Sequence, residues 1–143
     1  MSSVFVDTSA LYALFVPVDE NHREAATILE ELNRERTPLV TTNLVLLESY
    51  VLVHARTGRT GLLRFRGVVA RTPWLECIAT TSEHESDAWR LLEARSDKEY
   101  SFVDVASFVV MRALGIVRAF TFDSDFSQEG FEVARARPKG RGA

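Results

Sequence analysis

The feature that most constrains the fold is a regular alternation of short apolar runs with longer segments of helical periodicity. The first run, "SVFV" at residues 3–6, ends at Asp7 and is followed at once by the helix formers of residues 8–15. Further short runs predict strands at residues 39–42, 74–80, 117–122 and 131–136. Strands that alternate with helices are typical of parallel sheets covered on both faces. We therefore predict an α/β domain with a mainly parallel central sheet of about four or five strands flanked by helices.

The segments between these runs are predicted to be helical. They cover residues 8–15, 19–36, 43–56, 60–71, 83–95 and 101–115, with Gly58 and Gly115 as breaks and Ser82 as a cap. The length of 143 residues suits one domain. We assign residues 1–137 to that domain and residues 138–143, "PKGRGA", to a basic, disordered tail.

The sequence shows no membrane segment or signal peptide. No apolar run approaches the roughly 18 residues that cross a bilayer, and "MSSVFVDTS" lacks the basic-then-apolar pattern of a secretory signal. We therefore expect a cytoplasmic protein that does not enter membranes. The single cysteine, Cys77, has no cysteine partner and no clustered histidines, so we expect it to be a small buried side chain.

Basic residues are concentrated in two segments, although the net charge is −3. Residues 54–71 contain five arginines and no acid, and residues 133–141 contain four basic residues and no acid. This distribution fits a molecule with an acidic centre and basic flanks, but solvated surface arginines explain it as well.

Acidic residues follow two of the predicted strands. Asp7 comes directly after the first strand and Asp123 after the strand of residues 117–122. Ligands of open parallel sheets bind at the carboxyl ends of the strands, so we expect both side chains at that edge. The sequence leaves the place of Asp104 open.

Glu48 interrupts the apolar run "VLLESYVLV" at residues 45–53. In a helix, its neighbours three and four positions away are apolar: Leu44, Val45, Val51 and Leu52. A carboxylate on such a face requires a partner. An arginine and a metal ion are the two candidates.

The aspartates also have purely structural interpretations. Asp7 is a potential helix cap, and Ser101 with Asp104 has the spacing of a capping box. Asp123 and Asp125 in "TFDSDF" suit an aspartate-rich turn. A phosphatase with Asp7 as nucleophile is a further alternative, but Ser9 stands where such enzymes have a second aspartate.

Together, these acids favour a metal site. Gathered carboxylates repel one another unless a cation lies among them. Oxygen ligands without histidine or cysteine indicate a hard ion, Mg²⁺ or Mn²⁺, and such sites hydrolyse phosphodiesters.

Four segments together resemble the PIN-domain family, in particular the VapC-type toxins of prokaryotic toxin–antitoxin pairs. They are "VFVDTSALYAL", "NLVLLESYVL", "YSFVDVASFVVMRALGI" and "AFTFDSDFSQEGF", in the family's order and spacing between residues 4 and 131. The resemblance implies a metal-dependent endoribonuclease that is usually a homodimer and is inhibited by a small cognate antitoxin. A PIN-like domain that binds RNA or protein without cleaving it is the alternative.

The resemblance also implies roles for individual residues. Asp7, Glu48, Asp104 and Asp123 would form the catalytic, metal-binding quartet, with Glu48 either a ligand or a residue that orients water. Hydrogen-bonding support would come from Thr8, Ser9, Asn43 and Ser101. Asp125 would be peripheral. RNA phosphates would contact Arg56, Arg59, Arg64 and Arg66.

Overall fold

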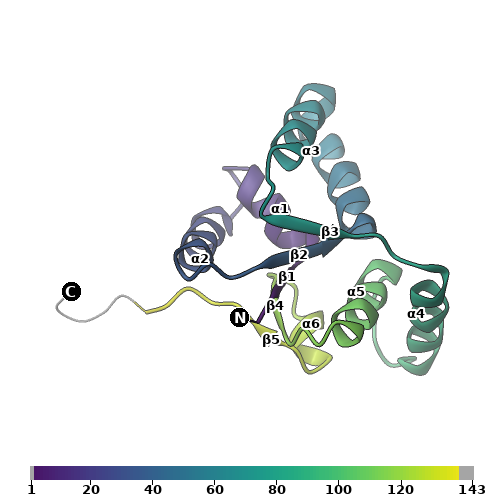
Figure 1. Ribbon diagram of the computed structural model, residues 1–143. Helices are drawn as coiled ribbons and strands as arrows, with labels where there is room; N and C mark the ends of the chain where they lie inside the picture. Colours follow the sequence, from purple (N-terminus) through teal and green to yellow (C-terminus); the bar gives the residue numbers. More distant parts are fainter. Residues whose placement is uncertain (1, 139–143) are drawn as a thin grey trace.

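The computed structural model describes residues 2–138 and contains one five-stranded parallel sheet with helices on both faces (Figure 1). The elements are β1 (Val4–Val6), α1 (Thr8–Phe15), α2 (His22–Arg34), β2 (Leu39–Thr42), α3 (Asn43–Ala70), β3 (Leu75–Ile78), α4 (Ser82–Ala94), α5 (Phe102–Ala113), β4 (Arg118–Phe120), α6 (Asp125–Gln128) and β5 (Glu132–Val133). The predicted α/β fold with a parallel sheet is confirmed.

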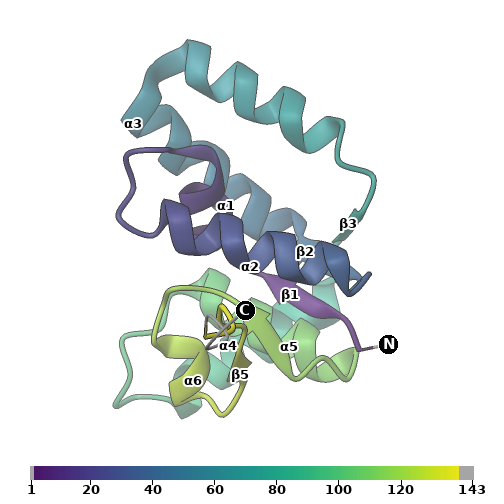
Figure 2. The same cartoon turned by 90° about the vertical axis from the view of Figure 1, so that its left-hand side faces the viewer.

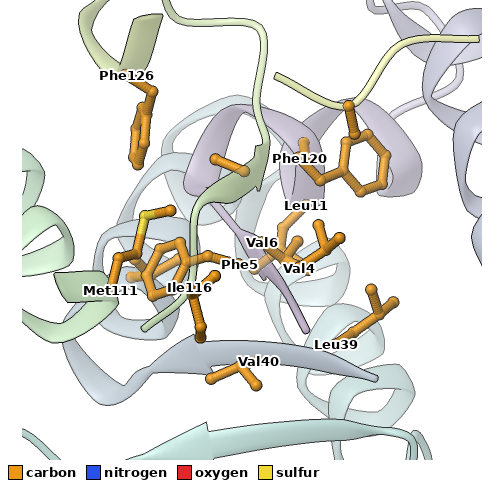
Figure 3. Packing of buried hydrophobic residues seen from close by; sticks show 14 of the residues in the cluster. Val4, Phe5, Val6, Leu11, Leu39, Val40, Met111, Ile116, Phe120 and Phe126 are labelled. Carbon is orange, nitrogen blue, oxygen red and sulfur yellow. The ribbon is translucent and has the colours of Figure 1, made fainter. Parts of the chain in front are cut away.

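The centre of the sheet is β1, whose three residues are all buried. Its side chains alternate between the two faces, as the pleat of a strand requires. Phe5 lies on the side of Met111 and Ile116 and its ring centroid is 6.4 Å from that of Phe126, whereas Val4 and Val6 point the other way (Figure 3). A strand that is apolar throughout is therefore explained by burial on both faces.

The strand order β3-β2-β1-β4-β5 creates a reversal beside β1. The chain builds outward from β1 to β2 and β3, then crosses to the other side of β1 to form β4. Figure 2 shows α1, α2 and α3 on one face of the sheet and α4, α5 and α6 on the other. Such a reversal leaves a crevice at the carboxyl ends of the two strands that flank it, here β1 and β4.

Helix α3 consists of two segments joined at Gly58. Gly58 has φ +77° and ψ −174°, a conformation that favours glycine, and it interrupts the helix where the sequence predicts a break. The first segment begins at Asn43 and is capped by Thr42, whose hydroxyl accepts a hydrogen bond from the Val45 N–H at 3.1 Å.

Several local predictions need correction. Thr81, not Ser82, caps α4, because its hydroxyl accepts from the His84 N–H while the His84 ring accepts from the Thr81 N–H, each at 3.1 Å. Cys77 is exposed and lies in β3, an edge strand of the sheet, so the prediction of a buried side chain is wrong. The segment after Asp123, interpreted as a turn, contains the short helix α6.

Two predictions concern regions that the structure covers only in part. Of the predicted tail, Pro138 is the last residue described and residues 139–143 lie outside the described part of the chain. Within residues 2–138, no helix combines the length and the apolar character needed to span a membrane.

Candidate active site

The site lies at the carboxyl ends of β1 and β4. The Asp7 N–H donates to the Phe120 carbonyl at 3.0 Å, one residue beyond the paired Val6 and Phe120. Asp7 and Thr121 therefore leave the sheet side by side, although they are far apart in sequence. This placement agrees with the edge predicted for Asp7.

The carboxylate of Asp7 is held by two hydroxyls. Its Oδ2 accepts hydrogen bonds from Ser9 Oγ at 3.0 Å and from Thr121 Oγ1 at 2.9 Å. Asp7 occupies the N-cap position of α1, but its side chain makes no capping hydrogen bond. The helix-cap interpretation is therefore wrong, and this side chain, only 3% exposed, is oriented toward the end of β4 instead.

The same hydroxyls fix the loop that follows β4. Ser9 Oγ accepts from the Phe122 N–H at 2.9 Å, and Thr121 Oγ1 accepts from the Asp123 N–H at 3.0 Å. Each hydroxyl thus connects the Asp7 carboxylate to the backbone that carries Asp123. Sequence reasoning missed Thr121, although a polar residue directly after a buried strand was a usable signal.

Asp104 both caps a helix and faces the site. Its Oδ2 accepts from the Ser101 N–H at 3.0 Å and its own N–H donates to Ser101 Oγ at 3.1 Å, so the capping box is present. Helix α5 leads into β4, which starts at the amino edge of the parallel sheet, so α5 begins at the carboxyl edge. The fold thereby settles the position of Asp104 that the sequence left open.

Three carboxylates converge at this point. Oxygen atoms of Asp104, Asp123 and Asp125 all lie within 4.8 Å of one another. The Asp125 N–H donates to Asp123 Oδ1 at 3.0 Å, which holds the first turn of α6 against the loop. Asp125, expected to be peripheral, thus lies within the close carboxylate group. A donor set of carboxylate oxygens fits a hard divalent cation such as Mg²⁺ or Mn²⁺.

The electrostatics of the group reflect burial without compensation by basic residues. Burial raises the pKa of Asp7 to about 6, against the hydrogen bonds from Thr121, Thr8 and Ser9, and the charge of Asp123 raises it further. Burial likewise raises the pKa of Asp104 to about 7, with contributions from Asp125, Asp7 and Asp123. Burial also raises the pKa of Asp123. A cation among these groups would offset both the cost of burying the charged carboxylates and their mutual repulsion.

Glu48 lies on the flank of α3 and not on its buried face. The first segment of the helix buries Val45, Ser49 and Val53, which leaves Glu48 half-buried and its neighbour Val51 64% exposed. Within residues 2–138, Glu48 has no ion pair with an arginine and does not belong to the close carboxylate group. Of the four apolar neighbours expected around Glu48, Val45 is buried but Val51 is largely exposed to solvent, so Glu48 does not lie on a wholly apolar face.

The remaining candidates occupy varied positions. The Thr8 hydroxyl faces the Val45 carbonyl at 3.5 Å, and Asn43 Oδ1 accepts from the Thr80 N–H at 2.8 Å, so neither side chain is bonded to a carboxylate of the site. The four arginines predicted to contact RNA are exposed around the break at Gly58: Arg56, Arg59, Arg64 and Arg66. Arg56, the first of these arginines, is about 20 Å along the helix axis from Asn43, where α3 begins.

Comparison with known proteins identifies relatives over nearly the whole chain. The 23S rRNA-specific endonuclease VapC20 of Mycobacterium tuberculosis, from the strains CDC 1551/Oshkosh and H37Rv, is 37% identical over 133 residues, which is 92% of this chain and 98% of the relative. The crystal structure of Mycobacterium tuberculosis VapC20, described as a Sarcin-Ricin loop cleaving toxin, matches with a TM-score of 0.83 and 36% identity. That match covers 93% of this chain and 99% of the other.

The family comparison agrees with the geometry. The model of the PIN domain matches residues 4–132, a range that includes every carboxylate of the site. With this match, the extensive relatives and the carboxylates at the ends of β1 and β4, the chain belongs to the PIN domain family.

Proposed function

We propose that this chain is a metal-dependent endoribonuclease and the toxin of a toxin–antitoxin pair. The observation that carries the proposal is the convergence of Asp104, Asp123 and Asp125 beside Asp7 without a basic side chain bonded to any of them in residues 2–138. Support comes from membership of the PIN family and from the similarity to VapC20.

The proposed substrate is RNA, cleaved at phosphodiester bonds. The relative is named for its action on 23S rRNA and its structure for cleavage of the Sarcin-Ricin loop. Structured ribosomal RNA is therefore the first substrate to test with this chain.

The proposed ligands of Mg²⁺, or alternatively Mn²⁺, are Asp104, Asp123 and Asp125, which form the close carboxylate group, and Asp7, which lies beside that group and not within it. When bound there, the ion would polarise a phosphoryl oxygen and lower the pKa of a water molecule. The protein's own contribution is orientation: hydroxyls hold the Asp7 carboxylate and the Ser101 N–H holds that of Asp104. Thr8 and Asn43 would act one step further out, through α1 and α3.

Glu48 completes the proposed catalytic set from the flank of α3. Its half-buried carboxylate has no competing arginine within residues 2–138, which leaves it available to orient water or to reach the ion. The exposed arginines Arg56, Arg59, Arg64 and Arg66 would attract more distant phosphates of a large RNA.

The proposed partners are a small cognate antitoxin and a second copy of this chain, in the cytoplasm. Exposed apolar side chains on α3 support an association of this kind, since Leu47 is 59% and Val51 64% exposed. Their position beside Glu48 would place a homodimer contact next to the site.

The proposal is tested by RNA cleavage with purified protein. We expect cleavage of ribosomal RNA that requires Mg²⁺ or Mn²⁺ and falls by more than about 100-fold in Asp104→Asn, because loss of outer-shell partners alone costs about 10–100-fold. We expect Glu48→Gln to remove most activity while its far-UV circular dichroism stays unchanged.

The matched control is Glu93→Gln, which neutralises an exposed carboxylate on α4. It should cleave like the unmodified chain. Cleavage that persists in chelator, or that is equal in Asp104→Asn, would contradict the proposal.

A further inference from the structure

A hollow of about 270 Å³ adjoins the carboxylate group on the side of β5. It is lined by Glu24, Thr121, Phe122, Asp123, Ser124, Ser127 and residues 133–135. Its volume is close to the lower limit of ordinary ligand pockets, about 300 Å³, which suits one nucleotide better than a larger ligand.

Asp123 is a wall shared by this hollow and the metal-binding group. A polymer whose phosphate reaches Asp123 from the metal side therefore has its neighbouring nucleotide at the opening of the hollow. The hollow and the carboxylate group are thus adjacent, close enough for neighbouring parts of one RNA strand.

Phe122 offers an aromatic surface inside the hollow. The residue directly precedes Asp123, and its side chain is half-buried. Its ring contacts Phe120 edge-on, with centroids 6.1 Å apart and an interplanar angle of 67°. Unpaired RNA bases stack on such rings, and the preceding loop hydrogen bond from the Phe122 N–H to Ser9 keeps the backbone in place.

Arg135 supplies the positive charge at the rim. It follows β5 at the carboxyl edge, is exposed, and forms no ion pair within residues 2–138. Arg137, two residues later, differs because its guanidinium pairs with Glu35 and its N–H donates to Glu31 at 3.1 Å. Of the two neighbouring arginines, Arg135 is therefore the one whose charge is available to a phosphate.

We propose that this hollow is a subsite for the nucleotide next to the scissile phosphate, with its base stacked on Phe122 and its phosphate bound by Arg135. The proposal rests on the proposed function and adds a place where a single-stranded part of the RNA is bound. Glu24, which also lines the hollow, is an acceptor suited to the amino group of a base, and its charge would disfavour a phosphate at that part of the wall.

The test measures binding and not cleavage. Fluorescence anisotropy follows a labelled single-stranded oligoribonucleotide of about eight nucleotides, at several salt concentrations, in an Asp104→Asn background that prevents turnover. We expect Phe122→Leu to weaken binding about fivefold or more, with an unchanged salt dependence, because stacking is lost. Phe122→Tyr keeps the ring and should bind like the parent.

Arg135→Ala should change the salt dependence. Loss of one phosphate contact lowers the slope of log affinity against log salt by about 0.7 for a single strand. The matched control is Arg90→Ala, an exposed arginine on α4 that pairs with Asp87 and should leave affinity and slope unchanged. Melting curves check the folding of each variant, and Arg135, being exposed, tests the subsite even if Phe122→Leu does not fold.

The outcomes separate the subsite from the proposed function. Equal affinity in Phe122→Leu, or an unchanged slope in Arg135→Ala, overturns the subsite even when the unmodified chain cleaves RNA. Weakened binding in both variants supports the subsite, and it does so even if the unmodified chain proves unable to cleave.

Discussion

Two carboxylates that lie four residues apart on the same short segment, Asp125 and Glu129, have opposite electrostatic surroundings. Glu129 directly follows α6 and its side chain is only 3% exposed. It accepts from Arg95 Nε at 2.9 Å and Nη2 at 3.0 Å, and from Arg112 Nη2 at 2.9 Å. Burial opposes its ionisation, but the two arginines outweigh burial and hold its pKa below the ordinary value.

Asp125 begins the same helix and forms no ion pair with an arginine in the part of the chain that the structure describes. Together with Asp104 and Asp123 it forms a group in which burial raises the pKa of both partners. Within residues 2–138, the hydrogen bonds that these carboxylates accept come from backbone N–H groups, which are neutral: Ser101 N–H donates to Asp104 and Asp125 N–H donates to Asp123.

The difference distinguishes a carboxylate with a structural ion pair from the carboxylates for which we propose a bound ion. Glu129 ties the end of α4 and the last turn of α5 to the segment after α6, and its charge is balanced inside the protein. The aspartates are oriented but not balanced, so their charge is left to be compensated from solution. An arginine partner, the alternative considered for Glu48, is thus used elsewhere in the same domain.

The largest expected effect that tests this comparison is stabilisation by metal. Because an ion that binds only the folded state stabilises it, Mn²⁺ or Mg²⁺ at about 100 times its Kd should raise the free energy of unfolding by about 2.7 kcal/mol. Urea unfolding with and without metal measures this. Asp104→Asn should lose the response, and its metal-free form should be no less stable than the unmodified protein. If millimolar metal leaves the free energy of unfolding of the unmodified chain unchanged, the distinction between Glu129 and the aspartates is wrong.

A somewhat smaller effect is expected from Glu129→Gln. We expect a loss of about 2 kcal/mol, less than the 3–5 kcal/mol of a fully buried pair, because Arg95 and Arg112 remain 37% and 46% exposed and are solvated once released. Chemical denaturation measures the change.

The control for this variant is Glu35→Gln, whose partner Arg137 is 74% exposed, and which should cost at most about 1 kcal/mol. The metal response of Glu129→Gln should persist. A Glu129→Gln protein as stable as the control would show that the buried pair contributes no more than a surface pair.

The smallest expected effect is on the pH dependence of the metal-free protein. The folded pKa values of Asp7 and Asp104, about 6 and about 7, exceed the unfolded value of about 3.9, so the folded state binds more protons between these limits. Lowering the pH from about 7.5 to about 6 should therefore raise the free energy of unfolding by about 1–2 kcal/mol. This stability is lost again as the pH rises through 6 to 7.

The contribution of Glu129 to the pH dependence of stability has the opposite sign. Its pKa is lowered, so its contribution is present above the ordinary glutamate pKa and is lost only in stronger acid, outside this window. Denaturation curves across the window measure the balance, and Asp104→Asn should remove most of the change. Stability that instead falls from about pH 7.5 to about 6 in chelator would mean that the aspartates are balanced like Glu129.

Much of the fold was predictable because its signals are local. The buried strand before Asp7, the break at Gly58 and the capping box of Ser101 and Asp104 each depend on residues within a few positions of one another. Two local predictions were wrong. Ser82 was predicted to cap α4, but Thr81 does so. Cys77 was predicted to be buried, but it is exposed on an edge strand.

Parts of the site could not be predicted because they depend on strand order. The pairing of β4 with β1 brings Thr121 to Asp7 across 114 positions, and local periodicity contains no information about that partner. The short turn of α6 returns Asp125 to Asp123, whereas the sequence suggested a peripheral residue.

By itself, the sequence determined the alternation of strands and helices, the acids that follow the strands, and the segregation of basic charge, because these follow from side-chain type and short-range spacing. Only the tertiary structure decided which carboxylates meet, which one receives arginines, and that Glu48 lies on a flank. Those outcomes depend on contacts between segments distant in the chain, and their free energies are set by the burial and charge that packing creates.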